Sequence, residues 1–238
     1  LLLSLGLRND QFTNANNFGE VYLDADNQWA PRLGAAWDVN GDSTFKVFGN
    51  AGRYFLAMPN NVAIRGASAS TFTREYYTYT GIDANGVPTG LTHVPRLDGG
   101  TGPYSSNGEY GQSIDVLSFA PSDLKNMYQD EYIFGMEHAF ADDWMIGAKL
   151  TYRDLKSAVD DICDPYTMAD VLEERGIDSS TVEIPGCFMF NPSGTNTFSL
   201  ADIDANGVRT GTRTEVTMSA DDWGFPDDMK RTYTGLDI

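Results

Sequence analysis

The residues best suited by type and spacing to bind a ligand lie at 202–207, in the sequence Asp-Ile-Asp-Ala-Asn-Gly. A calcium-binding loop begins with this pattern, two carboxylates and an amide at alternate positions followed by a glycine. Ca²⁺ prefers hard oxygen ligands, and the glycine permits the turn. The twelfth position of such a loop requires a bidentate Glu, but here it is Arg213. Two interpretations stay open. Asp202, Asp204 and Asn206 bind Ca²⁺, or they form an Asn-Gly hairpin turn and bond to their own backbone.

The same motif occurs earlier in the chain, where Ile82 to Gly90 repeats nearly all of Ile203 to Gly211. The earlier copy has Gly81 where the later copy has Asp202, so it lacks the first carboxylate. A hairpin turn needs only the Asn-Gly pair and a neighbouring residue that bonds to the backbone. The earlier copy is therefore a candidate turn without a complete set of calcium ligands.

Cys163 and Cys187 are the two cysteines of the chain, and both lie in one long polar segment. Two cysteines in one loop predict a disulfide where the loop lies outside the cytoplasm, as the strand pattern described below indicates, because such compartments are oxidising. The bond would contribute roughly 3 kcal/mol to the order of that loop. Two free thiols are the alternative. Between the cysteines, residues 167–176 read as a short helix that starts with a Thr167–Asp170 capping pair and ends at Gly176.

An aromatic stretch at residues 72–79, Phe-Thr-Arg-Glu-Tyr-Tyr-Thr-Tyr, is the best candidate for a ligand-binding surface. Tyrosine rings offer a large, rigid contact area together with a hydroxyl group, which suits a sugar or a peptide. We therefore expect Arg74, Tyr76, Tyr77 and Tyr79 to contact a ligand. The alternative is that these residues extend a strand and pack within their own loop.

Several functional classes have little support in the sequence. His93 and His138 are the only histidines, and the sequence contains no Gly-x-Ser-x-Gly, zinc or phosphate-loop motif. We therefore expect no enzymatic activity, and no cofactor other than the possible Ca²⁺. A protein that binds nucleic acid needs a basic patch. Here the net charge is −18 and the 16 Lys and Arg residues are dispersed, so we expect no nucleic acid partner.

The elements that must position these residues are β-strands. Apolar residues occupy alternate positions on both sides of Asn40-Gly41-Asp42, which is typical of strands with one apolar face. Gly41 supplies the positive φ that a short hairpin turn requires. The same pattern predicts six strands, at about residues 1–10, 29–39, 44–55, 130–140, 144–155 and 231–238. Between them we expect loops at about 11–28, 56–128 and 156–230.

Short and long connections alternate in this series of strands. Loops beyond about 15 residues are uncommon in compact soluble domains, whereas short turns at one end and long loops at the other are typical of an outer-membrane barrel. We therefore predict an all-β fold, an antiparallel transmembrane β-barrel fragment with short periplasmic turns and long extracellular loops. Because both ends of the chain fall within strand patterns, we expect a piece of a longer protein. A soluble β-sandwich with long loops would show the same alternation and is the alternative.

Short motifs in and next to these strands also resemble a known family. The motifs are Leu5-Gly6-Leu7-Arg8-Asn9-Asp10, Ala30-Pro31-Arg32-Leu33-Gly34, Asn40-Gly41-Asp42-Ser43-Thr44, Gly52-Arg53-Tyr54, and the segments 129–137 and 144–154. In this order and spacing they resemble the barrel of TonB-dependent outer-membrane receptors, most closely the Oar-like branch. Neither a plug domain nor a TonB box is recognisable within the 238 residues.

This resemblance implies that residues 1–238 are part of the barrel domain of a receptor in the outer membrane of a Gram-negative bacterium, with roughly 22 strands around a plug. The full-length protein would bind an extracellular small molecule, peptide or glycan and import it with the TonB system. Its other partners would be membrane lipid and its own plug domain. The residues expected to face the lumen are Arg32, Lys46, Glu137, Lys149 and Arg153. A porin or adhesin barrel and a soluble extracellular carbohydrate-binding β module are the alternatives.

Overall fold

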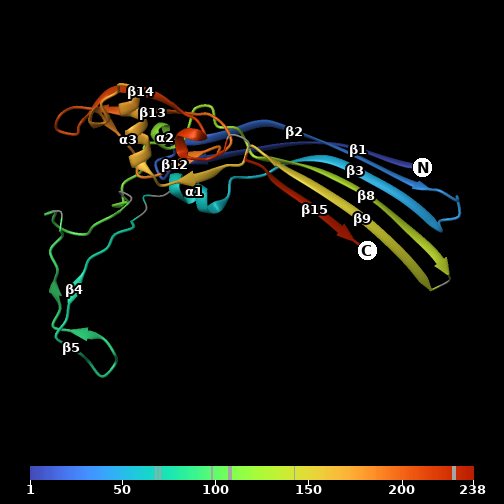
Figure 1. The fold of residues 1–238 in the computed structure, drawn as a ribbon, viewed down its shortest axis with the longest axis horizontal. Coiled ribbons are helices and arrows are strands. Elements are labelled where there is room, and N and C mark those ends of the chain that lie inside the picture. Colours follow the sequence, from blue (N-terminus) through green and yellow to red (C-terminus); the bar gives the residue numbers. More distant parts are fainter. Residues whose placement is uncertain (68, 70, 98, 107–108, 142, 227–228) are drawn as a thin grey trace.

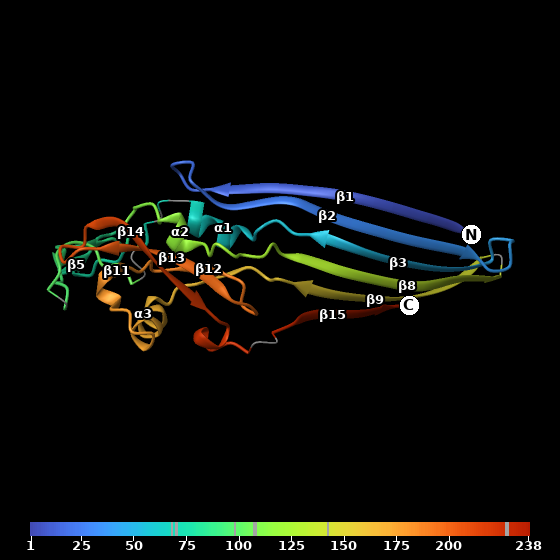
Figure 2. The same ribbon diagram turned by 90° about the horizontal axis from the view of Figure 1, so that it is seen from above.

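The computed structural model describes every residue of the chain except 68, 70, 98, 107–108, 142 and 227–228. Its main element is an open antiparallel sheet of six strands that lie side by side in chain order (Figure 2). The strands are β1 (Leu2–Ala15), β2 (Val21–Asp38), β3 (Phe45–Phe55), β8 (Tyr128–Ala141), β9 (Trp144–Lys156) and β15 (Arg231–Asp237). The all-β fold class is confirmed, and β1 and β15 form the two edges of the sheet.

The connection between β1 and β2 differs from the sequence-based expectation. The sequence predicts a loop at 11–28, and this prediction is wrong, because the strands leave only a turn at 16–20. Asp10 pairs with Gln28, but Phe12 pairs with Ala25, so the register shifts between them. Such a β-bulge adds a residue to one strand and interrupts the alternation of side chains. The regular pattern that predicts the strands at 1–10 and 29–39 therefore does not extend across the bulge to the parts of β1 and β2 nearest the turn.

Short turns join the strands at both ends of the sheet. At the β1–β2 turn, the side-chain oxygen of Asn16 accepts two backbone N–H groups, and Gly19 takes a φ of 83°. At the β2–β3 turn, the carboxylate of Asp38 accepts the N–H groups of Gly41 and Ser43 at 3.0 Å each. Gly41 takes a φ of 78°, the positive value predicted for this turn.

The pairing of the strands separates the residues into two faces of different chemistry. One row across the sheet consists of Leu3, Ala35, Gly49, Phe134, Leu150 and Leu236. A row on the opposite face consists of Gly6, Arg32, Gly52, Glu131, Arg153 and Tyr233. We call these the apolar face and the polar face, and both continue along the strands with the two-residue period of β-structure.

The apolar face is the more exposed of the two. Leu5 is 82% exposed, Phe134 63% and Leu33 56%, whereas Thr151 on the polar face is only 6% exposed. A soluble β-sandwich buries its apolar face against a second sheet. The described part of the chain places no second sheet of this kind over the apolar face, so these large apolar side chains stay exposed.

Aromatic rings on the polar face lie over glycines on the same face, either on the paired strand or two residues away on the same strand. A Cβ atom at Gly135 would collide with the ring of Phe48, and one at Gly235 would collide with Tyr233. The absence of a side chain at these glycines provides the space in which the rings lie flat against the sheet. This contact accounts for Phe48, an apolar residue among the polar residues of its face.

The segments after β3 and β9 form a compact cap beyond one end of the sheet, on the left in Figure 1. We define the cap as residues 56–67, 112–127 and 157–226. One apolar core lies within 157–226 and includes Phe188, Phe198 and Trp223. A second core joins Tyr22 of β2 to Phe119 and Met189 of the cap, and so fixes the cap on the sheet.

The cap contains more regular structure than the loops predicted at 56–128 and 156–230. Its elements are α1 (Asn60–Ala67), α2 (Val116–Phe119), β10 (Asp160–Ile162), α3 (Pro165–Glu174), η1 (Ser179–Thr181), β11 (Val182–Glu183), β12 (Phe188–Phe190), β13 (Asn196–Ile203), β14 (Arg209–Met218) and η2 (Asp221–Trp223). None of the helices in the described part of the chain is long and apolar enough to cross a membrane.

Helix α3 lies between the two cysteines, where the sequence predicts a helix. Its N-cap is Asp164, whose carboxylate accepts the N–H of Thr167 at 3.1 Å. The predicted Thr167–Asp170 capping pair is therefore wrong. Pro165 fits the first helical position because the missing N–H needs no partner there. At the other end Gly176 takes a φ of 76°, which confirms it as the residue that follows the helix.

The described residues of 71–110 project from the cap as a two-stranded arm, at the lower left in Figure 1. Single bridges pair Thr71 with Tyr110 and Arg74 with Tyr104. Further out, β4 (Tyr77–Thr78) pairs with β7 (Thr92–His93), and β5 (Gly81–Ile82) pairs with β6 (Pro88–Thr89). The tip of the arm is the turn at 83–87, which lies within the earlier copy of the repeated motif.

Candidate functional site

The five charged residues expected to face a lumen lie on the polar face of the sheet. Their partners are Glu137 for Lys46 (2.6 Å), Asp237 for Lys149 (3.0 Å), Glu131 for Arg153 (2.5 Å) and the ring of Tyr54 for Arg32 (4.4 Å to the centroid). Because these side chains are partly exposed, each ion pair contributes only about 0–1 kcal/mol to stability in water. The polar face thus presents compensated charges rather than a charge of one sign.

A groove of about 840 Å³ lies where the polar face meets the cap. The strands contribute Gln129, Arg153 and Tyr233 to it, and the cap contributes Asp160 and the Pro192–Ser193 turn. Residues 229–231, which lead into β15, form a further side. We call this the junction groove. It brings one predicted lumen residue, Arg153, next to segments that are far apart in the sequence.

Two buried asparagines fix the wall of the junction groove. Asn196 is fully buried, and its side chain accepts the N–H of Asn191 at 2.7 Å. The side chain of Asn191 accepts the N–H of Lys125 at 2.7 Å and donates to the carbonyl of Ala158 at 3.0 Å. Sequence reasoning missed both residues, because an asparagine in a polar segment usually indicates an exposed turn.

The arm carries a second groove, of about 590 Å³, which is lined by Arg74, Tyr76, His93 and Tyr104 among others. Two of the four predicted ligand residues, Arg74 and Tyr76, therefore share one concave surface. Tyr77 lies outside that lining, as does Tyr79, and its ring packs against His93 with 5.3 Å between centroids.

The candidate calcium residues lie at the β13–β14 hairpin. Asp202 belongs to β13 and accepts the hydroxyl of Thr214 at 2.7 Å. The carboxylate of Asp204 accepts the N–H groups of Asn206 and Val208 at 2.9 Å each. Asp83 makes the equivalent bonds at the tip of the arm. The hairpin thus gives both carboxylates partners of its own, as an Asx-type turn does.

The described residues include no group of three or more His, Cys, Asp and Glu side chains that is placed to hold a metal ion. The hairpin at 202–207 supplies two carboxylates and the amide of Asn206, and the place of the bidentate Glu is taken by Arg213. The donors present therefore do not fit a complete calcium loop.

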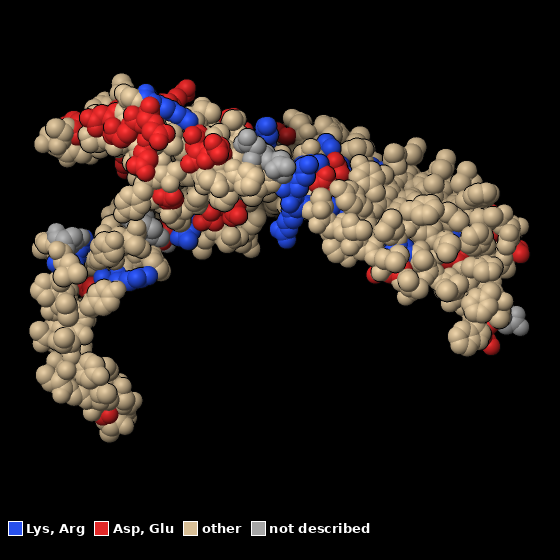
Figure 3. Space-filling model, in the orientation of Figure 1, with Lys and Arg blue, Asp and Glu red and all other residues tan. Residues whose placement is uncertain are grey.

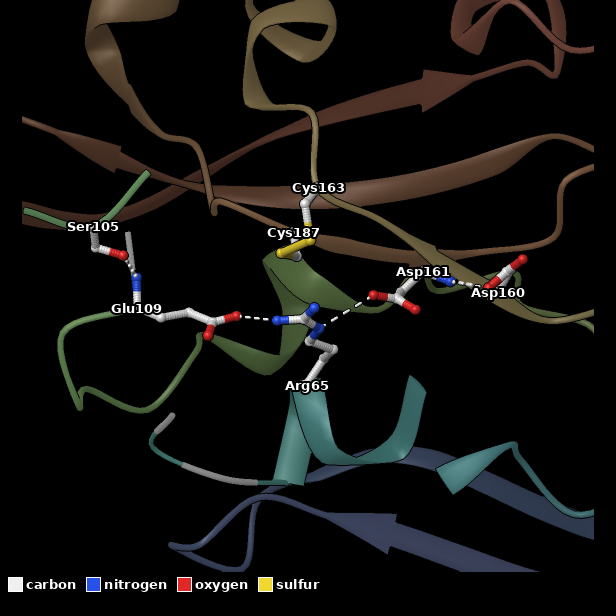
Figure 4. The surroundings of a disulfide bond; sticks show 7 residues. All are labelled: Arg65, Ser105, Glu109, Asp160, Asp161, Cys163 and Cys187. Carbon is white, nitrogen blue, oxygen red and sulfur yellow. Dashed lines mark hydrogen bonds and ion pairs between the residues drawn. A yellow bond between two sulfur atoms is a disulfide. The ribbon is translucent and has the colours of Figure 1, made fainter. Parts of the chain in front are cut away.

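A disulfide joins Cys163 to Cys187, with 3.9 Å between the Cα atoms (Figure 4). It connects the end of β10 to the start of β12. Close by, the guanidinium of Arg65 on α1 lies between the carboxylates of Glu109 and Asp161. The Arg65–Asp161 distance is 3.3 Å. This group of contacts ties the base of the arm to both long segments of the cap.

Asp115 holds the two long segments together at another point. Its carboxylate accepts the N–H groups of Leu117 and Ser118 at the start of α2, at 3.1 Å each. It also forms a bidentate pair with Arg213 of β14, at 2.9 and 3.2 Å. Burial opposes ionisation of Asp115, but the bonds from Arg213 and Ser118 outweigh it and hold the pKa below its ordinary value.

Comparison with known proteins gives one informative match. No family model matches the sequence, and no solved structure matches it. The chain is 26% identical over 178 residues to the TonB-dependent transporter Oar of Myxococcus xanthus. The match includes 67% of this chain but only 16% of that transporter, so the chain spans a small part of its relative. It indicates a distant relation to TonB-dependent transporters.

Proposed function

We propose that the chain is part of the β-barrel of a TonB-dependent outer-membrane transporter of the Oar-like branch. In this proposal residues 1–238 contribute consecutive strands to a larger barrel in the outer membrane of a Gram-negative bacterium. The full-length protein captures an extracellular ligand and imports it, without catalysing a reaction. The distant relation to Oar supports this class of function.

The observation that carries the proposal is the exposed apolar face of the six-stranded sheet. Large apolar side chains such as Leu5 and Phe134 are mostly exposed, whereas the paired charges lie on the opposite face. In water this arrangement is unfavourable, by about 25 cal/mol for each Å² of apolar surface left exposed. In a membrane barrel, alternation of lipid-facing apolar and lumen-facing polar residues is the stable arrangement.

The two ends of the sheet differ in a way that supports one orientation. The β2–β3 and β8–β9 turns are short and lie at the end far from the cap (Figure 1). Outer-membrane barrels have short periplasmic turns and long extracellular loops. The cap and the arm therefore face the outside, where they meet the ligand. The polar face, with Arg32, Lys46 and Arg153, lines the lumen and meets the plug domain, through which the TonB system acts.

Adjacent alanines in β2 provide the test of this proposal. Ala35 lies on the apolar face and Ala36 on the polar face, so that Ala35→Arg places a charge in lipid and Ala36→Arg places it in the lumen. An arginine on the lipid face costs about 2–4 kcal/mol near the middle of the membrane. We expect Ala35→Arg to reduce the amount of full-length protein assembled in the outer membrane, and Ala36→Arg to be tolerated.

The measurement is the heat-modifiable mobility of the full-length protein from isolated outer membranes, with total expression as the control. Equal tolerance of both substitutions, or the reverse order, would contradict the assignment of faces. A porin or an adhesin barrel would give the same result in this test. Deletion of the TonB protein of the host separates these classes, since ligand uptake stops only for a TonB-dependent transporter.

A further inference from the structure

The junction groove has the charge expected of a site for an anion. We propose that it binds a small anionic ligand, through a carboxylate or phosphate group that pairs with Lys230 and Arg231. The proposal deepens the transport function and rests on it, because the groove leads from the extracellular cap to the polar face. It adds a class of ligand and the residues that recognise it.

Lys230, just before β15, and Arg231, its first residue, differ from most basic residues of the sheet. Both side chains are exposed, and neither forms an ion pair within the described part of the chain. By contrast, Arg153 in the same groove is paired with Glu131 at 2.5 Å. Asp160 also lines the groove, and its carboxylate accepts the N–H of Asp161. The two uncompensated cations therefore outnumber the single anion of the described lining.

The negative charge of the surrounding cap directs an anion to this local positive charge. The whole chain carries a net charge of −18, and Asp and Glu residues gather on the cap (Figure 3). A cluster of Lys and Arg interrupts this distribution at the boundary between cap and sheet. An anion is repelled by most of the cap and attracted at the boundary, so the field directs it into the groove.

The shape of the groove is fixed before a ligand arrives. The bonds of Asn191 to Lys125 and Ala158 hold the Pro192–Ser193 turn in place, and Pro192 itself has a restricted φ. Binding therefore orders little of the chain, which favours affinity. The volume of about 840 Å³ lies within the range of small-molecule sites, roughly 300–1,000 Å³. Leu155 and Tyr233 supply an apolar and aromatic surface for the uncharged part of the ligand.

The test measures binding of two defined anions to the full-length protein purified in detergent. Citrate represents a carboxylate ligand and tripolyphosphate a phosphate ligand, and titration calorimetry reports the affinity of each. Hydrogen bonds to charged groups are among the stronger ones, so we expect Lys230→Gln and Arg231→Gln each to weaken binding at least about tenfold. Arg231→Lys should retain most of the affinity. Binding should also weaken as the salt concentration rises.

The matched control is Lys125→Gln, which removes the same charge from an exposed side chain of the cap and keeps the backbone groups of residue 125 that bond to Asn191. We expect it to change the affinity less than about twofold, because the position is outside the groove. Binding of one anion alone identifies its group as the one recognised. Failure of both anions to bind, equal binding by the groove variants, or an equal loss in Lys125→Gln would overturn the proposal. None of these outcomes changes the assembly result for Ala35→Arg, so the two proposals fail separately.

Discussion

Asp115 makes the stability of the cap depend on pH. Its ordinary pKa is 3.8, and the pair with Arg213 and the cap of α2 lower the pKa in the folded state. A carboxyl group whose folded-state pKa is lowered stabilises the fold at every pH above its unfolded value. The stabilisation is lost as the pH falls below 3.8 and through the lower folded-state value. The cap should therefore loosen in acid before the sheet does.

The substitution Asp115→Asn tests this effect. The amide still caps α2, but the bonds to Arg213 lose their charge, so we expect local unfolding of the cap to become easier by about 1–3 kcal/mol at pH 7. The variant should lose less stability than the parent protein below pH 3.8. Hydrogen exchange of residues 112–122 measures both effects, and Asp83→Asn at the exposed tip of the arm is the control. An equal acid response in both proteins would contradict the role of Asp115.

At the scale of elements, the disulfide separates the stability of the cap from that of the sheet. Replacing both Cys163 and Cys187 with serine should destabilise the segment 157–226 by about 2–4 kcal/mol. Both cysteines lie in the cap, so we expect the sheet to assemble as before. We expect faster tryptic cleavage after Arg175, with unchanged heat-modifiable mobility of the full-length protein. Loss of assembly would contradict this separation and would mean that the proposed barrel needs the cap to form.

The strands could be predicted from the sequence wherever the two-residue period continues without interruption. The period fails at the bulge near Phe12, so the parts of β1 and β2 between the bulge and their connecting turn could not be predicted. The N-cap Asp164 could not be predicted for a different reason. The pattern from Thr167 to Asp170 has the correct residue types for a cap, and only the backbone decides which polar residue bonds to the free N–H groups.

The candidate sites could be predicted only in part. Exposed aromatic residues are recognisable by type, but the side of the arm that faces the groove depends on pairing with residues far along the chain, such as Tyr104. The junction groove could not be predicted, because five separate segments form it and Lys230 precedes the last strand. Asn191 is a further case, since its importance follows from burial and not from its type.

At the scale of the whole molecule, the exposed apolar face and the two sheet edges decide how the isolated chain behaves. Edge strands present unpaired backbone groups that invite pairing with other chains. We expect the isolated 238-residue chain to aggregate in buffer and to become monodisperse only with detergent. Size-exclusion chromatography with light scattering measures this. A soluble monomer that binds a glycan without detergent would contradict the barrel and favour a carbohydrate-binding module.

The second core of the cap also imposes an order on folding. Its buried residues range in sequence from Tyr22 to Met189, so this core cannot form until the chain up to Met189 is present. Neighbouring strands such as β2 and β3 need only a short segment to pair, and local contacts of this kind form sooner than distant ones. A chain that appears N-terminus first therefore forms its first hairpins while the cap is still incomplete. During that interval the apolar residues that will contact Met189 are exposed, so the chain is then most prone to aggregation.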